Sequence, residues 1–203
     1  MKQFLKVLAF SLPLLAAMPA LAILEVSVGG QGILSSTGGG NWTGLGATNY
    51  SFSGAYGAQG EVRVNFPTSS WHFGVRYGQL GLSGSSGVNS LAMSSTLYSA
   101  LVSYRLIDTG LLFGPVVTYA LSGSGTLQNS LATTVGSTAT AGSVSGYTAG
   151  VEFGLKFPLL LAVEVGVGNL TMTNFSNNQL LNGTATNVTL SGTYARLAVG
   201  FSF

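Results

Sequence analysis

Residues that could do acid–base, nucleophilic or metal chemistry are few in this chain of 203 residues. It has seven Lys and Arg, five Asp and Glu, one His and no Cys. The single histidine, His72, has no identifiable Ser or Asp partner, and no G-x-S-x-G motif, P-loop or Cys/His metal spacing is present. We therefore expect no catalytic residue, no metal and no cofactor, and His72 to be either a member of a polar network or a polar residue at the membrane interface.

Residues 1–22 have the three parts of a cleaved secretory signal peptide. Lys2 and Lys6 form a basic start, residues 7–18 are a short apolar stretch, and residues 20–22 are a small-x-small cleavage site. Without this segment, residues 23–203 hold five Arg and Lys against five Asp and Glu. A formally neutral chain has no basic surface for a phosphate backbone, so nucleic-acid binding is excluded.

The low charge content also indicates that part of the folded surface is in contact with lipid rather than water. Charged residues make up 6% of the chain and apolar residues 46%, whereas soluble domains carry about 25% charged residues. Residues 23–203 contain no run of 18 apolar residues, so a spanning helix is excluded. The remaining structure that satisfies every backbone group in lipid is a closed β-barrel.

Apolar and polar residues alternate in eight segments, as in the strands of a membrane barrel. In residues 51–66, for example, Val62 and Val64 alternate with Glu61 and Arg63. The pattern predicts strands in residues 24–31, 51–66, 71–79, 96–106, 111–121, 147–157, 161–169 and 193–203.

The connections between these segments alternate between short and long. Three are tight turns, and the others are long Gly, Ser, Thr and Asn stretches. These long stretches fall near residues 34–50, 80–95, 122–145 and 170–190. Short periplasmic turns and long outer loops are typical of outer-membrane barrels. Pro115 lies inside the fifth segment, where it removes a ladder hydrogen bond, and we expect a bulge there.

This pattern resembles the small eight-stranded outer-membrane β-barrels of Gram-negative bacteria. The resemblance covers residues 23–203 and includes the last strand, in which Leu197, Val199 and Phe201 face outward and Phe203 ends the chain. It implies an all-β, closed antiparallel barrel in contact with outer-membrane lipid, with periplasmic termini and long loops outside. It also implies that these four residues are the signal recognised by the barrel-assembly machinery.

Nine of the ten charges in residues 23–203 have inward parity and lie within about seven residues of a predicted periplasmic turn or chain end. At about 3.4 Å per residue and a tilt near 45°, they occupy the lowest 17 Å or so of the lumen. We call these nine residues the charged belt. They are Glu25, Glu61, Arg63, Arg76, Arg105, Glu152, Lys156, Glu164 and Arg196.

The charged belt is expected to hold the barrel together as an ion-paired plug, because an eight-stranded barrel is just wide enough for side chains to fill it. The expected pairs are Glu25 with Arg196, Glu61 with Arg63 and Arg76, and Lys156 with Glu152 and Glu164. Arg105 is expected to join this network, and Asp108 to lie outside it in a turn.

Three function classes follow. A porin-like structural or interaction barrel of the cell envelope is favoured, because the lumen is plugged and the long connections carry no charge. The alternative is a narrow channel or binding protein for small apolar solutes, since the inward positions above the charged belt are small or neutral. They form an open cavity unless Leu80, Leu97 and Tyr194 close it. A lipid-modifying barrel enzyme is the least favoured class.

One row of outward-facing residues consists mostly of residues with small side chains. Gly54, Ala58 and Gly60 flank Tyr56 on the second predicted strand, where other strands carry bulky apolar groups. Small residues allow membrane-embedded surfaces to approach closely. We hypothesise that this face meets another copy and that the oligomer encloses lipid; relief of curvature in a narrow barrel is the competing explanation.

Overall fold

The computed structural model describes residues 23–34, 41–43, 51–52, 55–66, 69–86, 89–131, 134–156, 159–175 and 187–203. The predicted signal peptide and Gly54 lie outside these residues. The eight long strands are β1 (Ile23–Leu34), β4 (Ala55–Asn65), β5 (Trp71–Ser86), β6 (Asn89–Tyr104), β8 (Leu111–Leu131), β9 (Thr134–Leu155), β10 (Leu160–Phe175) and β11 (Asn187–Ser202). The short strands β2 (Asn41–Thr43), β3 (Ser51–Phe52) and β7 (Ile107–Asp108) pair with β11, β5 and β8.

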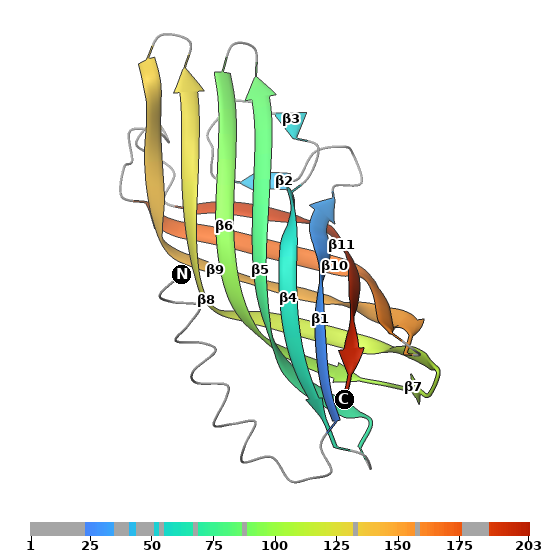
Figure 1. The fold of residues 1–203 in the computed structure, drawn as a ribbon. Helices are drawn as coiled ribbons and strands as arrows, with labels where there is room; N and C mark the ends of the chain where they lie inside the picture. The colour runs from blue at the N-terminus through green and yellow to red at the C-terminus, as the bar shows by residue number, and fades with distance from the viewer. Residues whose placement is uncertain are drawn as a thin grey trace.

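The long strands form one closed antiparallel barrel in the order β1-β4-β5-β6-β8-β9-β10-β11 (Figure 1). Closure is made by β1 and β11, which pair from Glu25 opposite Ser202 to Leu34 opposite Thr193. The predicted fold class is therefore confirmed. Each predicted segment overlaps one long strand, and the segment 51–66 also includes the short strand β3. The described part of the chain contains no helix that is long and apolar enough to cross a membrane. We call the end of the barrel that holds Ile23 and Phe203 the lower end, and the opposite end the upper end.

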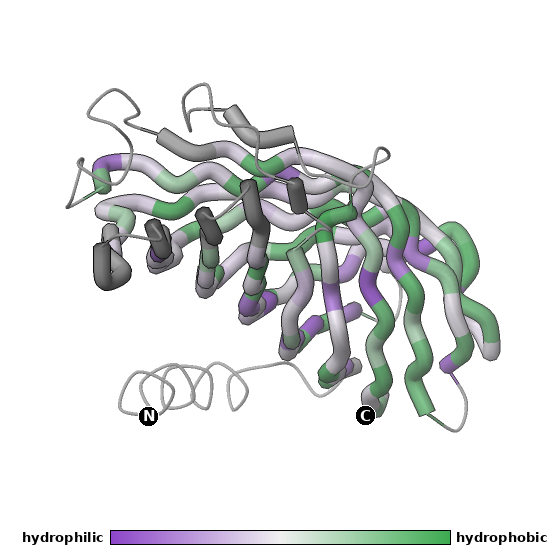
Figure 2. Tube along the Cα trace, turned by 90° about the horizontal axis from the view of Figure 1, so that it is seen from above, coloured by the Kyte–Doolittle hydropathy of each residue, from purple (hydrophilic) through white to green (hydrophobic). Residues whose placement is uncertain are grey.

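The outward face near the lower end is a continuous apolar band. Outward residues such as Phe73, Val151 and Val199 are exposed, while their neighbours along the strands are buried in the lumen. Figure 2 shows this alternation as changes between strongly hydrophobic and strongly hydrophilic positions along the strands near the C-terminus. The side-chain period of two therefore assigns one face to the lumen and the other to an apolar surrounding.

Two of the predicted long loops are instead strand. β5 and β6 stay paired up to Ser86 opposite Asn89. β8 and β9 pair up to Tyr119 opposite Tyr147, and again from Gly125 opposite Ala141 to Leu131 opposite Thr134. Figure 1 shows these four strands projecting beyond the rest of the barrel. The expectation of loops at residues 80–95 and 122–145 was wrong because the alternation inverts there rather than stopping. On β5, the lumen side changes from Arg76 to Leu80 and Leu82, and the outward side from Val75 to Gln79.

The irregularity near Pro115 also differs from the prediction. The β8–β9 register runs without a shift from Gly114 through Val116, and the bulge lies higher, between Tyr98 opposite Ser122 and Ser99 opposite Ala120. Pro115 is tolerated because the β6–β8 ladder ends beside it, at Ser103 opposite Val116. Pairing resumes in β7, so the missing N–H faces an interruption in the neighbouring strand.

Candidate functional site: the charged belt in the barrel lumen

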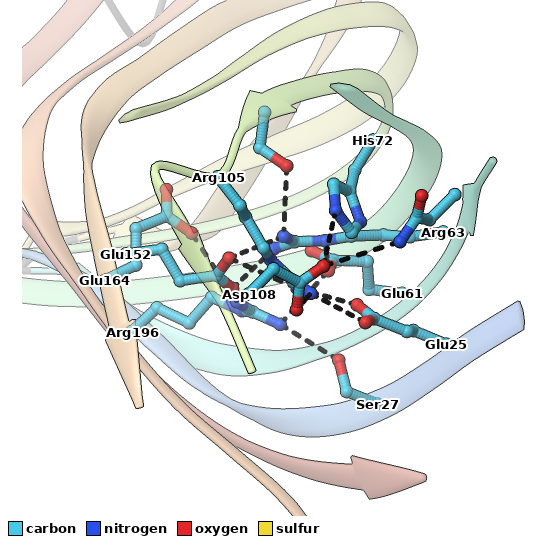
Figure 3. A network of polar contacts seen from close by, with 12 residues as sticks. Glu25, Ser27, Glu61, Arg63, His72, Arg105, Asp108, Glu152, Glu164 and Arg196 are labelled. Carbon is cyan, nitrogen blue, oxygen red and sulfur yellow. Dashed lines mark hydrogen bonds and ion pairs between the residues drawn. The ribbon is translucent and has the colours of Figure 1, made fainter. Parts of the chain in front are cut away.

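All nine residues of the charged belt point into the lower half of the lumen, and all but the half-buried Lys156 are buried. They come from β1, β4, β5, β9, β10 and β11 and from the residues that follow β6 and β9. Figure 3 shows the resulting network of carboxylates and guanidinium groups. Ionised groups at this depth remain charged only if each is paired and hydrogen-bonded.

The closest ion pairs cross the lumen instead of linking neighbouring strands. Arg63 on β4 donates two hydrogen bonds to Glu152 on β9, at 2.6 and 2.7 Å. Arg76 on β5 donates to Glu164 on β10 at 2.7 Å. In the closed ring, β4 and β9 are four strands apart, as are β5 and β10, so each pair joins opposite walls. The two-pronged geometry is the strong form of an arginine–carboxylate contact.

Glu61 links the remaining arginines in the middle of the lumen. Its carboxylate accepts hydrogen bonds from the Nε atoms of Arg63 and Arg76, the latter at 2.7 Å, as predicted from neighbouring strands. Arg196 on β11 lies 3.4 Å from both Glu61 and Glu152. Every carboxylate in this layer therefore contacts more than one cation, and the layer acts as a single network.

Two of the predicted pairings were wrong. Glu25 does not pair with Arg196; it accepts two 2.6 Å hydrogen bonds from Arg105 and lies 3.1 Å from Lys156. The β1–β11 register explains this, because Arg196 is opposite Gln31, six residues above Glu25. Arg196 instead donates to Ser27 at 3.0 Å. Lys156 follows the end of β9 and therefore does not reach Glu152 or Glu164.

Asp108 belongs to the network, contrary to the prediction that it lies outside it. The turn that carries β7 brings its carboxylate to 2.8 Å from Lys156 Nζ, 3.3 Å from Arg105 Nη1 and 3.2 Å from His72 Nε2. The Asn65 side chain also donates to it at 3.4 Å. A turn residue has no strand parity, which is why alternation did not reveal this site. His72 is fully buried in the expected polar setting.

The environment of Asp108 determines its ionisation. Partial burial by itself would raise the pKa of its carboxyl group, but the contacts with His72 and Lys156 and the charge of Arg105 outweigh burial. The pKa of Asp108 is therefore held well below its ordinary value. At neutral pH the carboxylate remains a charged link between the turn and the strand ends at the lower end of the barrel.

An apolar layer fills the lumen above the charged belt. We call it the apolar plug, and its members include Ile33, Leu80, Leu82, Met93, Leu127, Val144, Leu170, Met172, Leu190 and Tyr194, with Leu97 packed against them. Between the two layers lies a cavity of about 30 Å³, lined by side chains that include Gln31, Arg76, Thr118 and Tyr194. A cavity of this volume is large enough to hold water, and it is far smaller than the several hundred Å³ of a typical ligand pocket. The small inward positions near Gly168 are occupied by Ile33 and Tyr194.

The other predicted residues lie on the outer surface. Tyr56 and Ala58 are exposed, and a side chain built at Gly60 would meet no atom within 4 Å. The four terminal residues of the predicted assembly signal also face outward. They are Leu197, Val199, Phe201 and Phe203. In the described part of the chain, no group of three or more His, Asp or Glu side chains could hold a metal ion.

The closed eight-stranded antiparallel barrel with a filled lumen is the architecture of small outer-membrane β-barrel proteins. Neither a protein-family model nor a curated protein matches this chain. The chain is similar to Ail, the attachment invasion locus protein of Yersinia pestis, with 12% identity over 90% of this chain and 99% of Ail and a TM-score of 0.51. Ail is also known in complex with the heparin analogue sucrose octasulfate.

A second similar structure is a major outer membrane protein from Thermus thermophilus. It shares 14% identity over 89% of this chain and 99% of its own length, with a TM-score of 0.55. At these identities the similarity establishes the fold of the barrel. It does not transfer a ligand or an activity.

Glu152 gives the sharpest test of the charged belt. Glu152→Gln removes the negative charge of the Arg63 pair, replaces one of its two acceptor oxygens by an amide donor, and leaves buried guanidinium groups without full compensation. Breaking one partner of a buried pair costs about 3–5 kcal/mol, so we expect a loss of that size in urea unfolding of the refolded protein. Ser27→Ala, which removes only a neutral acceptor of Arg196, is the control and should cost about 1 kcal/mol. Equal effects of the two changes would contradict the role of the network.

Asp108 should make stability depend on pH in the acid range. Because its pKa is lower in the folded protein than the unfolded value of about 3.9, its contribution is complete above that pH and declines as the pH falls below it. We expect Asp108→Asn to destabilise the barrel at pH 7 and the difference from wild type to shrink below about pH 4. Urea unfolding followed by circular dichroism at several pH values measures this. A difference that is constant from about pH 7 to about pH 3 would contradict it.

Proposed function

We propose that this protein is a sealed outer-membrane barrel that acts as a structural or interaction component of the cell envelope. The observation that carries the proposal is the double filling of the lumen, with the charged belt below and the apolar plug above. The cavity between the two layers is small, with a volume of about 30 Å³. Side chains that bridge opposite walls serve stability better than transport.

The exposed apolar band supports a membrane location. Trp71, Phe73 and Tyr104 form an aromatic cluster on its lower side, with the rings of Trp71 and Tyr104 5.0 Å apart. Aromatic rings of this kind sit at the boundary between lipid and water. We place the lower end, with both barrel termini and the short turns, in the periplasm and the long upper hairpins outside the cell. Leu197, Val199, Phe201 and Phe203 would then be presented to the barrel-assembly machinery.

Self-association is the finer part of the proposal. The outward face of β4 has little bulk at Ala58 and Gly60, and the β1 register places Gly30 opposite Ala58. This extends the small face across two strands, next to the exposed ring of Tyr56. In a bilayer, small residues on this face let two barrels approach closely. Where the other outward faces of the associated barrels do not fit together, lipid would fill the space, and the oligomer would enclose it.

The two alternatives have weaker support. A binding protein for small apolar solutes needs a pocket of about 300 Å³ or more, whereas the cavity here has a volume of about 30 Å³. A lipid-modifying enzyme needs an oriented nucleophile and base, whereas His72 is fully buried against Asp108 at the lower end of the lumen. A site for a sulfated ligand such as the sucrose octasulfate bound by Ail would need Arg or Lys on the outer surface, whereas the arginines of this barrel are buried in the lumen.

The sealed lumen predicts an electrically silent protein. We expect no discrete conductance steps in planar bilayers, because buried side chains of the charged belt and of the apolar plug fill the lumen in two layers. Flotation with vesicles and protection from protease establish that the barrel has inserted, and a porin serves as the conducting control. Steps in the wild type that disappear in Gly168→Phe, which adds bulk beside Ile33 and Tyr194, would favour the channel instead.

Self-association predicts an oligomer that depends on the small face. Gly60→Leu adds bulk where a barrel alone has open space, so the monomer should fold normally while the oligomer weakens about tenfold or more. Native mass spectrometry of the detergent-extracted protein measures both species. Val165→Leu, an exposed apolar position on β10, is the matched control. A wild type that is entirely monomeric would refute self-association while leaving the sealed barrel intact.

A further inference from the structure

Four tyrosines form a row on the outer surface of consecutive strands. Tyr77 on β5 is opposite Tyr98 on β6, with ring centres 5.1 Å apart, and Tyr119 on β8 is opposite Tyr147 on β9. The two pairs are adjacent, because Tyr119 is opposite Ala100, two residues from Tyr98. Tyr119 and Tyr147 are 62% and 48% exposed. We call these four residues the tyrosine row.

On β5 and β9 the tyrosine row lies where the outward surface changes from apolar to polar: the exposed residues below it are Val75 and Val151, and those above it are Gln79 and Ser145. On β8 the outward surface stays apolar one position higher, at the exposed Leu121. Gln79 donates a hydrogen bond of 2.7 Å from its side-chain amide to the Tyr77 hydroxyl. The row therefore presents aromatic faces to the apolar side and hydroxyl and amide groups to the polar side.

No charged side chain accompanies the tyrosine row. All ten Asp, Glu, Lys and Arg residues of 23–203 belong to the charged belt or, in the case of Asp108, lie beside it. A phosphate or sulfate group bound at the row would have no Arg or Lys as a counter-ion. An uncharged ligand needs no counter-ion, and its hydroxyl groups can hydrogen-bond to the side chains of tyrosine, glutamine and serine.

We propose that the tyrosine row binds the uncharged saccharide headgroup of an outer-leaflet lipid. A sugar ring presents polarised C–H groups that pack on the negative face of an aromatic ring, and hydroxyl groups that hydrogen-bond at its rim. The acyl chains of the same lipid lie along the apolar band below the row. This inference rests on the proposed membrane location and orientation, and it adds the chemical class of the lipid that the barrel prefers.

The test is lipid selectivity of the inserted barrel. Purified protein is refolded into phosphatidylcholine vesicles containing a small fraction of spin-labelled digalactosyl diacylglycerol, phosphatidylglycerol or phosphatidylcholine, and the association constant of each lipid is measured by electron paramagnetic resonance. We expect the glycolipid to associate about fivefold more strongly than phosphatidylcholine, and phosphatidylglycerol to show no preference. The double variant Tyr119→Phe and Tyr147→Phe keeps the rings but removes the hydroxyls, and should lose most of the preference.

The control is Tyr104→Phe at the lower end, which removes a hydroxyl from the aromatic cluster far from the tyrosine row and should retain the preference. Equal association of all three lipids, or a preference for phosphatidylglycerol, overturns the inference. Displacement of the glycolipid by soluble digalactose would show a free-sugar site and overturn the assignment to lipid. Failure of the wild type to enter the vesicles, seen by flotation, would refute the proposed membrane location itself.

Discussion

Charge neutralisation inside a narrow space is the constraint on which this barrel depends. The arginines of the charged belt are buried beside carboxylates in a lumen just wide enough for their side chains. Such charges are acceptable because each guanidinium lies close to carboxylates, through two-pronged contacts for Arg63 and Arg105 and through several longer ones for Arg196. Since the Arg63–Glu152 and Arg76–Glu164 contacts join opposite walls, the same interactions that neutralise the charges also link the two sides of the barrel.

The lower and upper parts of the same strands are suited to different surroundings, lipid below and water above. Near the lower end, apolar residues face outward and the lumen is polar, as expected for a wall in lipid. Beyond the tyrosine row the arrangement is reversed: Leu80 and Leu127 face the lumen, and Ser and Thr face outward. This reversal is the usual arrangement of a soluble sheet. The upper part of the barrel is thus built as a water-soluble structure on a membrane-type base.

Much of the fold could be predicted from the sequence, because alternation assigns a face to each strand residue. It placed Glu164 and Arg76 correctly in the lumen, but it gives no height along the axis, so the partner of Glu25 depended on a register that only the structure provides. Asp108 was missed because a turn has no alternation. The upper hairpins were missed because their outward residues are polar, which resembles a loop when the lumen side is not considered.

The partners of the cross-lumen pairs are far apart along the chain, which bears on how the barrel is made. Arg63 and Glu152 are separated by 89 residues, and Arg76 and Glu164 by 88. In a sheet that has reached only β8, Arg63 and Arg76 share Glu61 but still lack Glu152 and Glu164, their partners across the lumen. The contacts that span the lumen therefore form late along the chain, after β9 and β10 have joined the sheet.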